Sequence, residues 1–495
     1  MLGVQSVHRG SFRHMERHAT ALQVAAAVRS GEVSPTEVLE HYLSRVDLLD
    51  GELNAFALRD DERARADARA ADDAVVAARR NGAELAPFAG VPIPVKDLYD
   101  VAGWVTGHGS VAVSDEPAVL DELPVERLRW AGFVLMGKTT TPEFGSVSAT
   151  ECERTGITRN PWNADRTPGG SSGGAAAAVA ADMAPIGHAS DGGGSIRIPA
   201  SCTGLVGLKA SRGRISTRIY GVVGASTNGA VTKDVADSAA ILDVLSQVDH
   251  GSWVVAPPPA RPFAHEVGAD PGRLRVRLSV ENALGLPVDP ECDAAARSVA
   301  NRLSDLGHDV VEAAPVWPDA GVFLEKFITI WNCLAILAPV VDESRMEPHN
   351  RAAFDAARAT DAFVYLGADA ELQRESRALV SQFRADPYRA GAADDAGFDL
   401  LISPTMSVQP ILAGTIMDGV DQMATAPIMN AVPMACYTSI FNATGQPAIS
   451  IPAHVSGDGL PVGVQIVGAP WREDVLIRVA SQLERAQPWA ALPVL

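Results

Sequence analysis

Hydrophobic and polar positions along the chain follow helical and strand periods in turn. Between residues 19 and 46, apolar residues recur at helical spacing in two runs. The runs are separated at 30–35, where Ser34 can cap a helix and Pro35 can begin it. This pattern predicts a helical hairpin. The polar segment 60–80, rich in Ala, Arg and Asp, predicts a solvated helix.

Short apolar runs further along the chain indicate buried strands. These runs lie at 88–95, 133–136, 204–208, 398–402 and 462–467. An alanine-rich run at 175–181 and longer patterns within 250–430 predict helices between them. A Pro-rich segment at 256–262 indicates a surface connection. The alternation of strands and helices favours an α/β layer architecture.

The composition is that of a folded protein with a sizeable core. The chain has 495 residues, of which 47% are hydrophobic and 20% charged. A formal net charge of −19, with no local run of Lys and Arg, argues against a nucleic-acid partner. The five cysteines are scattered without a CxxC pair, so neither a zinc site nor a disulfide framework is predicted.

The start of the chain lacks the features of a targeting segment. The first 18 residues are polar and basic and contain no apolar core like that of a signal peptide. No uninterrupted apolar stretch reaches the ~18 residues that a membrane-spanning helix needs. We therefore expect a cytoplasmic protein that does not contact membranes.

Two glycine-rich segments carry the candidate chemistry. The first, 167–174, precedes the alanine-rich helix, and on its own it could be a flexible linker or an anion-binding loop. The second, 190–201, places three glycines directly before Ser195. Successive backbone N–H groups can turn toward one point there, as an oxyanion formed by attack of Ser195 requires.

A serine nucleophile also needs a base. His188 precedes Ser195, but a structural role is favoured for it, and no G-x-S-x-G elbow surrounds the serine. A lysine can serve when desolvation and neighbouring dipoles leave part of it neutral. Lys96 fits this requirement because it follows the apolar run 91–95. A lysine at a strand end is otherwise usually exposed to solvent, so the glycine segments are what favour a catalytic role.

The blocks 90–97, 169–174 and 191–199 resemble the defining segments of the amidase signature family, and similarity extends over nearly the whole chain. The resemblance implies a single α/β domain, 1–495, with a large mixed twisted β-sheet flanked by α-helices. It also implies a signature core at about 85–215. The region at about 250–440 is expected to vary among relatives and to cover the substrate pocket.

The resemblance further implies a catalytic relay. In that family the first serine of the glycine-serine block follows a cis peptide and bridges a lysine to the nucleophile. Carried over, this serine is Ser171, which the spacing from Lys96 and Ser195 favours over Ser172. Neutral Lys96 would draw a proton through Ser171 from Ser195, whose Oγ attacks the amide carbonyl. No metal or organic cofactor is expected.

The expected oxyanion donors are the backbone N–H groups of Gly192, Gly193 and Gly194, together with that of Ser195. Gly192 stands where many relatives have threonine or another side chain, which could loosen this loop. The expected supporting residues are Ser172, Asp191 and Arg197.

Two other functions fit parts of the sequence. Residues 132–139 match the written P-loop pattern, but the apolar residues inside the match indicate a buried strand and disfavour nucleotide binding. Within the family, a glutaminase-like subunit of a transfer-RNA-dependent amidotransferase would depend on a partner protein. The apolar region 320–440 favours a stand-alone hydrolase instead.

The expected substrate is a small amide, hydrophobic or aryl, with carbamate or ester cleavage as further activities. The C-terminal third resembles bacterial enzymes acting on synthetic amides, including cyclic nylon-oligomer hydrolases and amidase-type urethanases. Seven apolar residues of this region are available for a hydrophobic pocket, although core packing is the favoured role for them: Phe323, Phe327, Trp331, Met423, Ile428, Met429 and Met434. A homodimer is expected.

Overall fold

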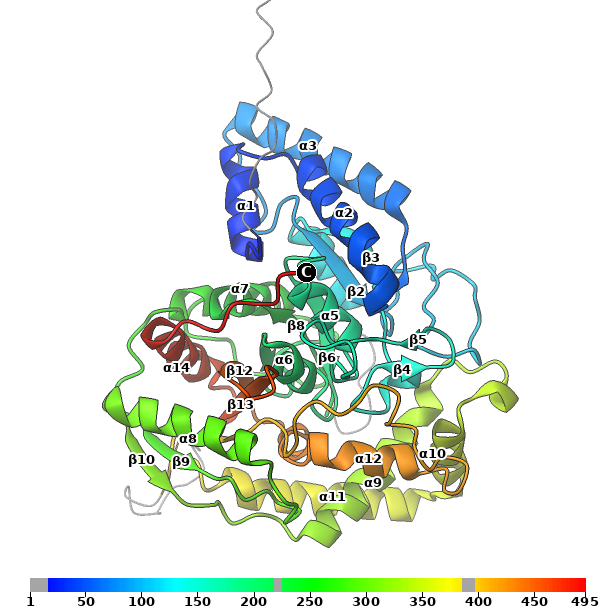
Figure 1. The fold of residues 1–495 in the computed structure, drawn as a ribbon, viewed down its shortest axis with the longest axis vertical. Coiled ribbons are helices and arrows are strands. Elements are labelled where there is room, and N and C mark those ends of the chain that lie inside the picture. The colour runs from blue at the N-terminus through cyan, green and yellow to red at the C-terminus, as the bar shows by residue number, and fades with distance from the viewer. Residues whose placement is uncertain (1–16, 218–224, 385–396) are drawn as a thin grey trace, which may run out of the picture.

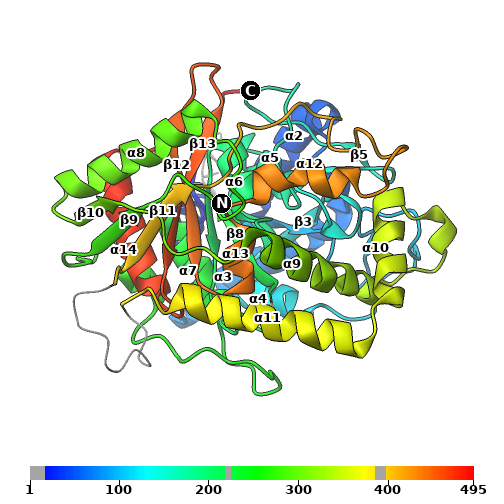
Figure 2. The same ribbon diagram turned by 90° about the horizontal axis from the view of Figure 1, so that it is seen from below.

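An eight-stranded mixed β-sheet forms the centre of the molecule. The computed structural model describes residues 17–217, 225–384 and 397–495. The strand order is β10-β9-β11-β13-β12-β7-β8-β6. The strands are β6 (Gly187–Asp191), β7 (Val206–Lys209), β8 (Thr227–Thr232), β9 (Arg275–Leu278), β10 (Asp309–Glu312), β11 (Leu400–Pro404), β12 (Ala448–Val455) and β13 (Pro461–Gly468). Helices flank the sheet (Figures 1 and 2), which confirms the predicted fold class.

The sheet joins distant parts of the chain into one domain. Strand β9 pairs in parallel with β10 and β11, and the other neighbouring strands pair antiparallel. Strand β12, near the end of the chain, pairs with β7 through Ala448 opposite Lys209. The middle and last thirds of the sequence therefore share one hydrogen-bonded ladder.

A smaller sheet lies beside β6 and carries the candidate base. Its order is β1-β3-β2, with β1 (Phe56–Leu58), β2 (Pro92–Lys96) and β3 (Val134–Thr139). Strands β2 and β6 are in contact, and the backbone N–H of Lys96 donates to His188 Nδ1 at 3.4 Å. Lys96 is thus held beside the strand that leads to Ser195. A short hairpin is formed by β4 (Glu151–Cys152) and β5 (Gly156–Ile157).

The N-terminal helices confirm the predicted hairpin. Helix α1 (Ala21–Ser30) ends at Gly31, and α2 (Pro35–Leu53) begins after Ser34. The Ser34 side chain accepts from the Glu37 N–H, and Pro35 is the first helical residue. The predicted solvated helix is α3 (Asp61–Asn81), and only three of its residues are buried. These three helices lie together at one end of the molecule (Figure 1).

The remaining helices pack on the sheets or extend from them. They are α4 (Leu123–Trp130), α5 (Gly173–Ala180), α6 (Arg197–Thr203), α7 (Val235–Leu245), α8 (Pro290–Asp305), α9 (Ala320–Leu334), α10 (Pro348–Ala359), α11 (Ala362–Val380), α12 (Ala426–Ala435), α13 (Ser439–Ala443) and α14 (Glu473–Ala486). The alanine-rich run forms α5, as predicted. The Pro-rich segment 256–262 is mostly exposed and has no helix or strand, which confirms a surface connection.

The P-loop match is a strand. Residues 134–139 form β3, and all six are buried. Lys138 is fully buried and pairs with Asp97 at 2.9 Å, so it cannot reach a phosphate in a surface loop. This geometry agrees with the sequence-based argument against nucleotide binding.

Helix α9 is apolar for a reason other than core packing. Judged only by its length and composition, the segment 320–337 could cross a membrane. A single helix of this kind is weak evidence for a membrane span, and Glu325 and Lys326 interrupt its apolar sequence. Only Phe323 and Ile330 of α9 are buried. Four other apolar side chains of this helix line the cavity described below.

Candidate active site

Lys96 is the last residue of β2 and its side chain is fully buried. Its Nζ donates to Ser171 Oγ at 2.7 Å and to Ser190 Oγ at 3.2 Å. Burial lowers the pKa of Lys96 to about 7, because the charged form loses its hydration, and the nearby Asp191 carboxylate opposes this effect only in part. A substantial fraction of Lys96 is therefore neutral near pH 7 and can accept a proton.

Ser171 occupies the loop that leads into α5. The peptide bond between Gly170 and Ser171 is cis, as the resemblance predicts. The following glycines let this loop approach its neighbours closely: a Cβ on Gly174 would lie 2.3 Å from Thr140 Oγ1. The next residue, Ser172, donates its hydroxyl to the Ser190 carbonyl at 3.2 Å. These contacts hold the loop against β6 and point Ser171 at Lys96.

Ser195 lies in the turn between β6 and α6. Its residue is 9% exposed, and it lines a cavity together with Gly193 and Gly145. Ser171 is close to the same cavity, because a Cβ on Gly145 would lie 3.2 Å from Ser171 Oγ. Within the described residues, no hydrogen bond joins Ser195 to Ser171. The serine hydroxyl is thus free to turn toward either Ser171 or a substrate.

A buried ion pair braces the turn before Ser195. Arg197 donates to both carboxylate oxygens of Asp191 at 2.9 Å, and both side chains are fully buried. This pairing holds the pKa of Asp191 well below its usual range against the opposing effect of burial. Arg197 also donates to Gln465 Oε1 at 2.6 Å and to Asn442 Oδ1 at 2.7 Å. The pair therefore ties the turn to β13 and α13.

The geometry of Gly194 differs from the oxyanion prediction. Its N–H donates to Asp191 Oδ1 at 2.8 Å, and the carbonyl of the same peptide, that of Gly193, accepts from Thr438 Oγ1 at 2.6 Å. The N–H of Gly194 is thus already engaged with a carboxylate. A glycine is nevertheless required there, because φ is 135° and a Cβ would lie 2.3 Å from Thr438 Oγ1.

Three N–H groups around the turn remain available to a ligand. Those of Gly192, Gly193 and Ser195 have no hydrogen-bond partner among the residues that the structure describes. Two of these residues, Gly193 and Ser195, line the cavity. Of the three glycines predicted as oxyanion donors, Gly192 and Gly193 thus have a free N–H, whereas the N–H of Gly194 is held by Asp191.

Some residues of this site carry no clear signal in the sequence. Ser190 places its hydroxyl on Lys96, and Thr438 and Asn442 hold the turn from α13 and the residue before it. His188 takes the structural role that was favoured for it: burial lowers its pKa to about 3, and its ring bonds the Lys96 backbone and Asn228.

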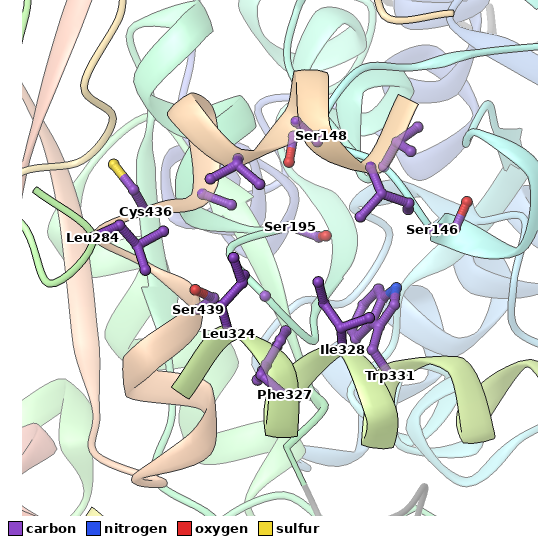
Figure 3. Close-up of a pocket in the computed structure, with 17 residues that line it drawn as sticks. Ser146, Ser148, Ser195, Leu284, Leu324, Phe327, Ile328, Trp331, Cys436 and Ser439 are labelled. Carbon is purple, nitrogen blue, oxygen red and sulfur yellow. The ribbon is translucent and has the colours of Figure 1, made fainter. Parts of the chain in front are cut away.

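The cavity in front of Ser195 lies between α9 and α12 (Figure 3). Leu324, Phe327, Ile328 and Trp331 of α9 line one side. Helix α12 lies opposite, and its residue Ile428 also lines the cavity. Among the described lining residues none is charged. The cavity therefore suits an uncharged, largely apolar ligand.

The seven pocket candidates separate into three groups. Phe327, Trp331 and Ile428 line the cavity, which the sequence had left open beside the favoured core packing. Phe323 and Met434 are buried in the core, where Phe323 stacks on Phe327. The remaining two were predicted wrongly. Met423 and Met429 are 51% and 46% exposed, respectively, and line neither the cavity nor the core.

Gly192 touches the aromatic wall of this cavity. A Cβ on Gly192 would lie 3.2 Å from Trp331 Cζ3, and Trp331 stacks on Phe327. The backbone of Gly192 has no positive φ, so its conformation is open to other residues. The missing side chain is therefore what lets the indole ring approach the turn before Ser195.

We expect Gly192→Ala and Trp331 substitutions to be energetically coupled. The added methyl must displace the indole ring, so Gly192→Ala should lower kcat/KM for a small amide by about tenfold, and Trp331→Leu should relieve most of this loss. Steady-state kinetics on the double-mutant cycle measures the coupling, expected at about 1 kcal/mol. Gly193→Ala is the matched control, because its Cβ meets nothing within 4 Å. Equal coupling of both glycines to Trp331 would contradict this explanation.

Nearly the whole chain is similar to known proteins. The Amidase family model matches residues 37–477. The chain is 41% identical over 483 residues to 6-aminohexanoate-cyclic-dimer hydrolase of Pseudomonas sp. (strain NK87), covering 94% of each. A solved structure of 6-aminohexanoate cyclic dimer hydrolase with substrate matches with a TM-score of 0.85 at 37% identity, covering 96% of this chain and 98% of that one. The structure of peptide amidase from Stenotrophomonas maltophilia matches with a TM-score of 0.76 at 26% identity, and the match covers 96% of this chain and 98% of that one.

Proposed function

The chain belongs to the amidase signature family and hydrolyses C–N bonds of amides, and on that premise we propose that it acts through an acyl-enzyme on Ser195. The observation that carries this proposal is the hydrogen bond of 2.7 Å between Lys96 and Ser171. It joins a buried lysine with a pKa of about 7 to a hydroxyl beside the cavity that holds Ser195. The three groups have the chemistry of a base, a relay and a nucleophile.

The first half of the reaction forms the acyl-enzyme. Neutral Lys96 accepts the proton of Ser171, which accepts the proton of Ser195 as that side chain turns toward it. The Ser195 Oγ–carbon bond forms, and the carbonyl oxygen becomes an oxyanion bonded by the free N–H groups of Gly192, Gly193 and Ser195. The C–N bond then breaks, and Ser171 gives its proton to the departing nitrogen while Lys96 returns one to Ser171.

The second half releases the acid. Water enters the position of the amine, loses a proton through Ser171 to Lys96, and attacks the acyl carbon. A second oxyanion collapses, the ester bond to Ser195 breaks, and the proton returns through Ser171 to Ser195. Asp191 and Arg197 take no proton in this scheme. They hold the turn so that the N–H groups point into the cavity.

The cavity supports a small, uncharged, apolar amide as the substrate. Its described lining has no charged side chain, and α9 contributes an aromatic wall. A relative acts on a cyclic amide, the 6-aminohexanoate cyclic dimer, which likewise has no free charged ends. Carbamates and esters form the same type of tetrahedral intermediate, so we include both as further substrates of this site.

The same cavity argues against a glutaminase-like subunit. Glutamine carries an ammonium and a carboxylate, and burying either without a partner is costly. The described lining residues offer neither charge a partner. The similarity to 6-aminohexanoate-cyclic-dimer hydrolase over 94% of both chains also favours a hydrolase over a glutaminase-like subunit. Rapid hydrolysis of glutamine with no hydrolysis of aryl amides would reverse this choice.

A panel of chromogenic substrates with one shared acyl group tests the proposed function. A p-nitroanilide, a p-nitrophenyl carbamate and a p-nitrophenyl ester release a coloured group when cleaved. We expect turnover of the anilide, and intact mass spectrometry after rapid quenching should show the enzyme heavier by the acyl group. Turnover without any acyl adduct, even for the ester with its good leaving group, would contradict the acyl-enzyme.

The cytoplasmic location and the homodimer stay predictions from the sequence. The same applies to the division into a signature core at about 85–215 and a variable region at about 250–440. The proposed relay and the turn before Ser195 lie inside the first range. Most of the apolar wall lies inside the second, which supports assigning substrate choice to that region.

A further inference from the structure

Ser146 lies in the cavity wall next to the proposed relay. It follows Gly145, where an added Cβ would lie 3.2 Å from Ser171 Oγ, and both residues line the cavity. Figure 3 shows Ser146 on the same side of Ser195 as Trp331. Most other lining residues are apolar. A hydroxyl on the Ser171 side of the cavity is therefore well placed to meet the departing nitrogen of an amide.

A buried histidine holds this hydroxyl. His349, from α10, is 1% exposed, and its Nε2 lies 3.0 Å from Ser146 Oγ. Its other ring nitrogen, Nδ1, has no hydrogen-bond partner and lies 3.8 Å from Glu347 Oε2, which also has none. Ser146, His349 and Glu347 thus form a line that ends in the cavity.

The hydrogen bonds along this line can be satisfied in one direction only. Ser146 has a single hydroxyl proton, and its Oγ also lies 3.0 Å from the Glu143 carbonyl, which can only accept. Both contacts of Ser146 are hydrogen bonds only if its proton goes to Glu143 and His349 donates from Nε2. The Nδ1 lone pair then faces Glu347, which favours a protonated carboxyl there.

The environment of both titratable groups agrees with this direction. Burial lowers the pKa of His349 to about 4, so the ring is neutral near pH 7. Burial, aided by neighbouring glutamates, raises the pKa of Glu347 to about 7. The ring can therefore keep one proton on Nε2. Ser146, which lines the cavity, is left with its donor used and one lone pair without a partner among the described residues.

We propose that Ser146, oriented by His349, accepts a hydrogen bond from the N–H of the substrate's scissile amide. This inference rests on the proposed function, since it assumes that amides are cleaved at Ser195. An N–H turned toward Ser146 leaves the nitrogen lone pair free to face Ser171, which must protonate it before the C–N bond breaks. The site therefore selects secondary amides over esters of the same shape, because an ester has no such N–H. Ser146 is a binding residue, and His349 and Glu347 are positioning residues.

The test compares a p-nitroanilide with the p-nitrophenyl ester of the same acyl group. Ser146→Ala should lower kcat/KM for the anilide by about fivefold to tenfold, the value of one hydrogen bond, and change that for the ester by less than about twofold. His349→Leu should likewise lower the ratio of kcat/KM for the anilide to kcat/KM for the ester. His349→Gln should keep it, since the glutamine amide can donate to Ser146 in place of Nε2. Ser148→Ala is the matched control: it lines the same cavity and should change both substrates alike.

A binding measurement separates this inference from the proposed function. In Ser195→Ala, which cannot form the acyl-enzyme, calorimetry gives the Kd of the intact anilide and ester. Adding Ser146→Ala should raise the anilide Kd about fivefold to tenfold and leave the ester Kd unchanged. If the wild type cleaves neither substrate, the proposed function fails and these two Kd ratios still decide the role of Ser146. Equal effects on anilide and ester in both experiments would overturn the inference.

Discussion

Replacing Ser195 by alanine is expected to lower kcat for the anilide by about 10⁴-fold or more, because no other group can form the acyl bond. The free energy of unfolding should change by less than about 0.5 kcal/mol, since no hydrogen bond within the described residues holds the Ser195 hydroxyl. Stopped assays and thermal denaturation of the same preparations measure both quantities.

Ser439→Ala is a suitable comparison for this variant. Ser439 also lines the cavity, so its replacement removes a hydroxyl from the same space without touching the proposed relay. We expect a change in KM and a kcat within a few fold of the wild type. An active Ser195→Ala enzyme would show that another group is the nucleophile.

The second large effect is expected for the base. Lys96→Met should lower kcat by about 10²- to 10⁴-fold, the range typical of removing a general base. In the wild type only neutral Lys96 can accept a proton, so kcat/KM should rise with pH and level off above about 7, the pKa that burial gives this lysine. The methionine variant should lose this inflection. A flat wild-type profile between pH 5.5 and 9 would contradict Lys96 as the base.

The stability of Lys96→Met should not fall together with its activity. The folded-state pKa of Lys96 lies below its usual value of 10.5, so the unfolded chain binds more protons between about pH 7 and 10.5. The free energy of unfolding contributed by Lys96 therefore falls as pH drops through that window and is constant below it. Methionine fills similar volume and needs no proton. We expect Lys96→Met to be at least as stable as the wild type at pH 7, so its inactivity could not be assigned to unfolding.

Local rules were enough to predict much of the fold. Ser34 and Pro35 begin a helix because capping and a fixed φ act within one turn. Residues 134–139 form a strand although 132–139 match a P-loop pattern, because the four apolar side chains at 133–136 need burial. The pairing of Lys96 with Ser171, in contrast, rested on the resemblance of their blocks to the amidase signature family and not on a local rule.

The parts that sequence could not predict depend on contacts between distant segments. The pattern of three glycines indicated free N–H groups, but the reach of the Asp191 carboxylate to Gly194 depends on how the turn folds back. A role for Ser146 can be inferred only from its contact with His349, which α10 places beside it. The aromatic wall has a local pattern in the sequence. Leu324, Phe327, Ile328 and Trp331 recur at helical spacing on one face of α9. That face points into a cavity instead of the core.

The uncharged lining of the cavity has a consequence for the fate of the products. Cleavage of a neutral alkyl amide creates a carboxylic acid and an alkylamine, and near pH 7 both ionise once they meet water. Neither ion finds a partner among the described lining residues, so returning either of them to the cavity requires the loss of its hydration. The substrate enters as an apolar molecule, and the products are expelled as ions. For such substrates the site should therefore show weak product inhibition, so that the rate of hydrolysis falls little as products accumulate.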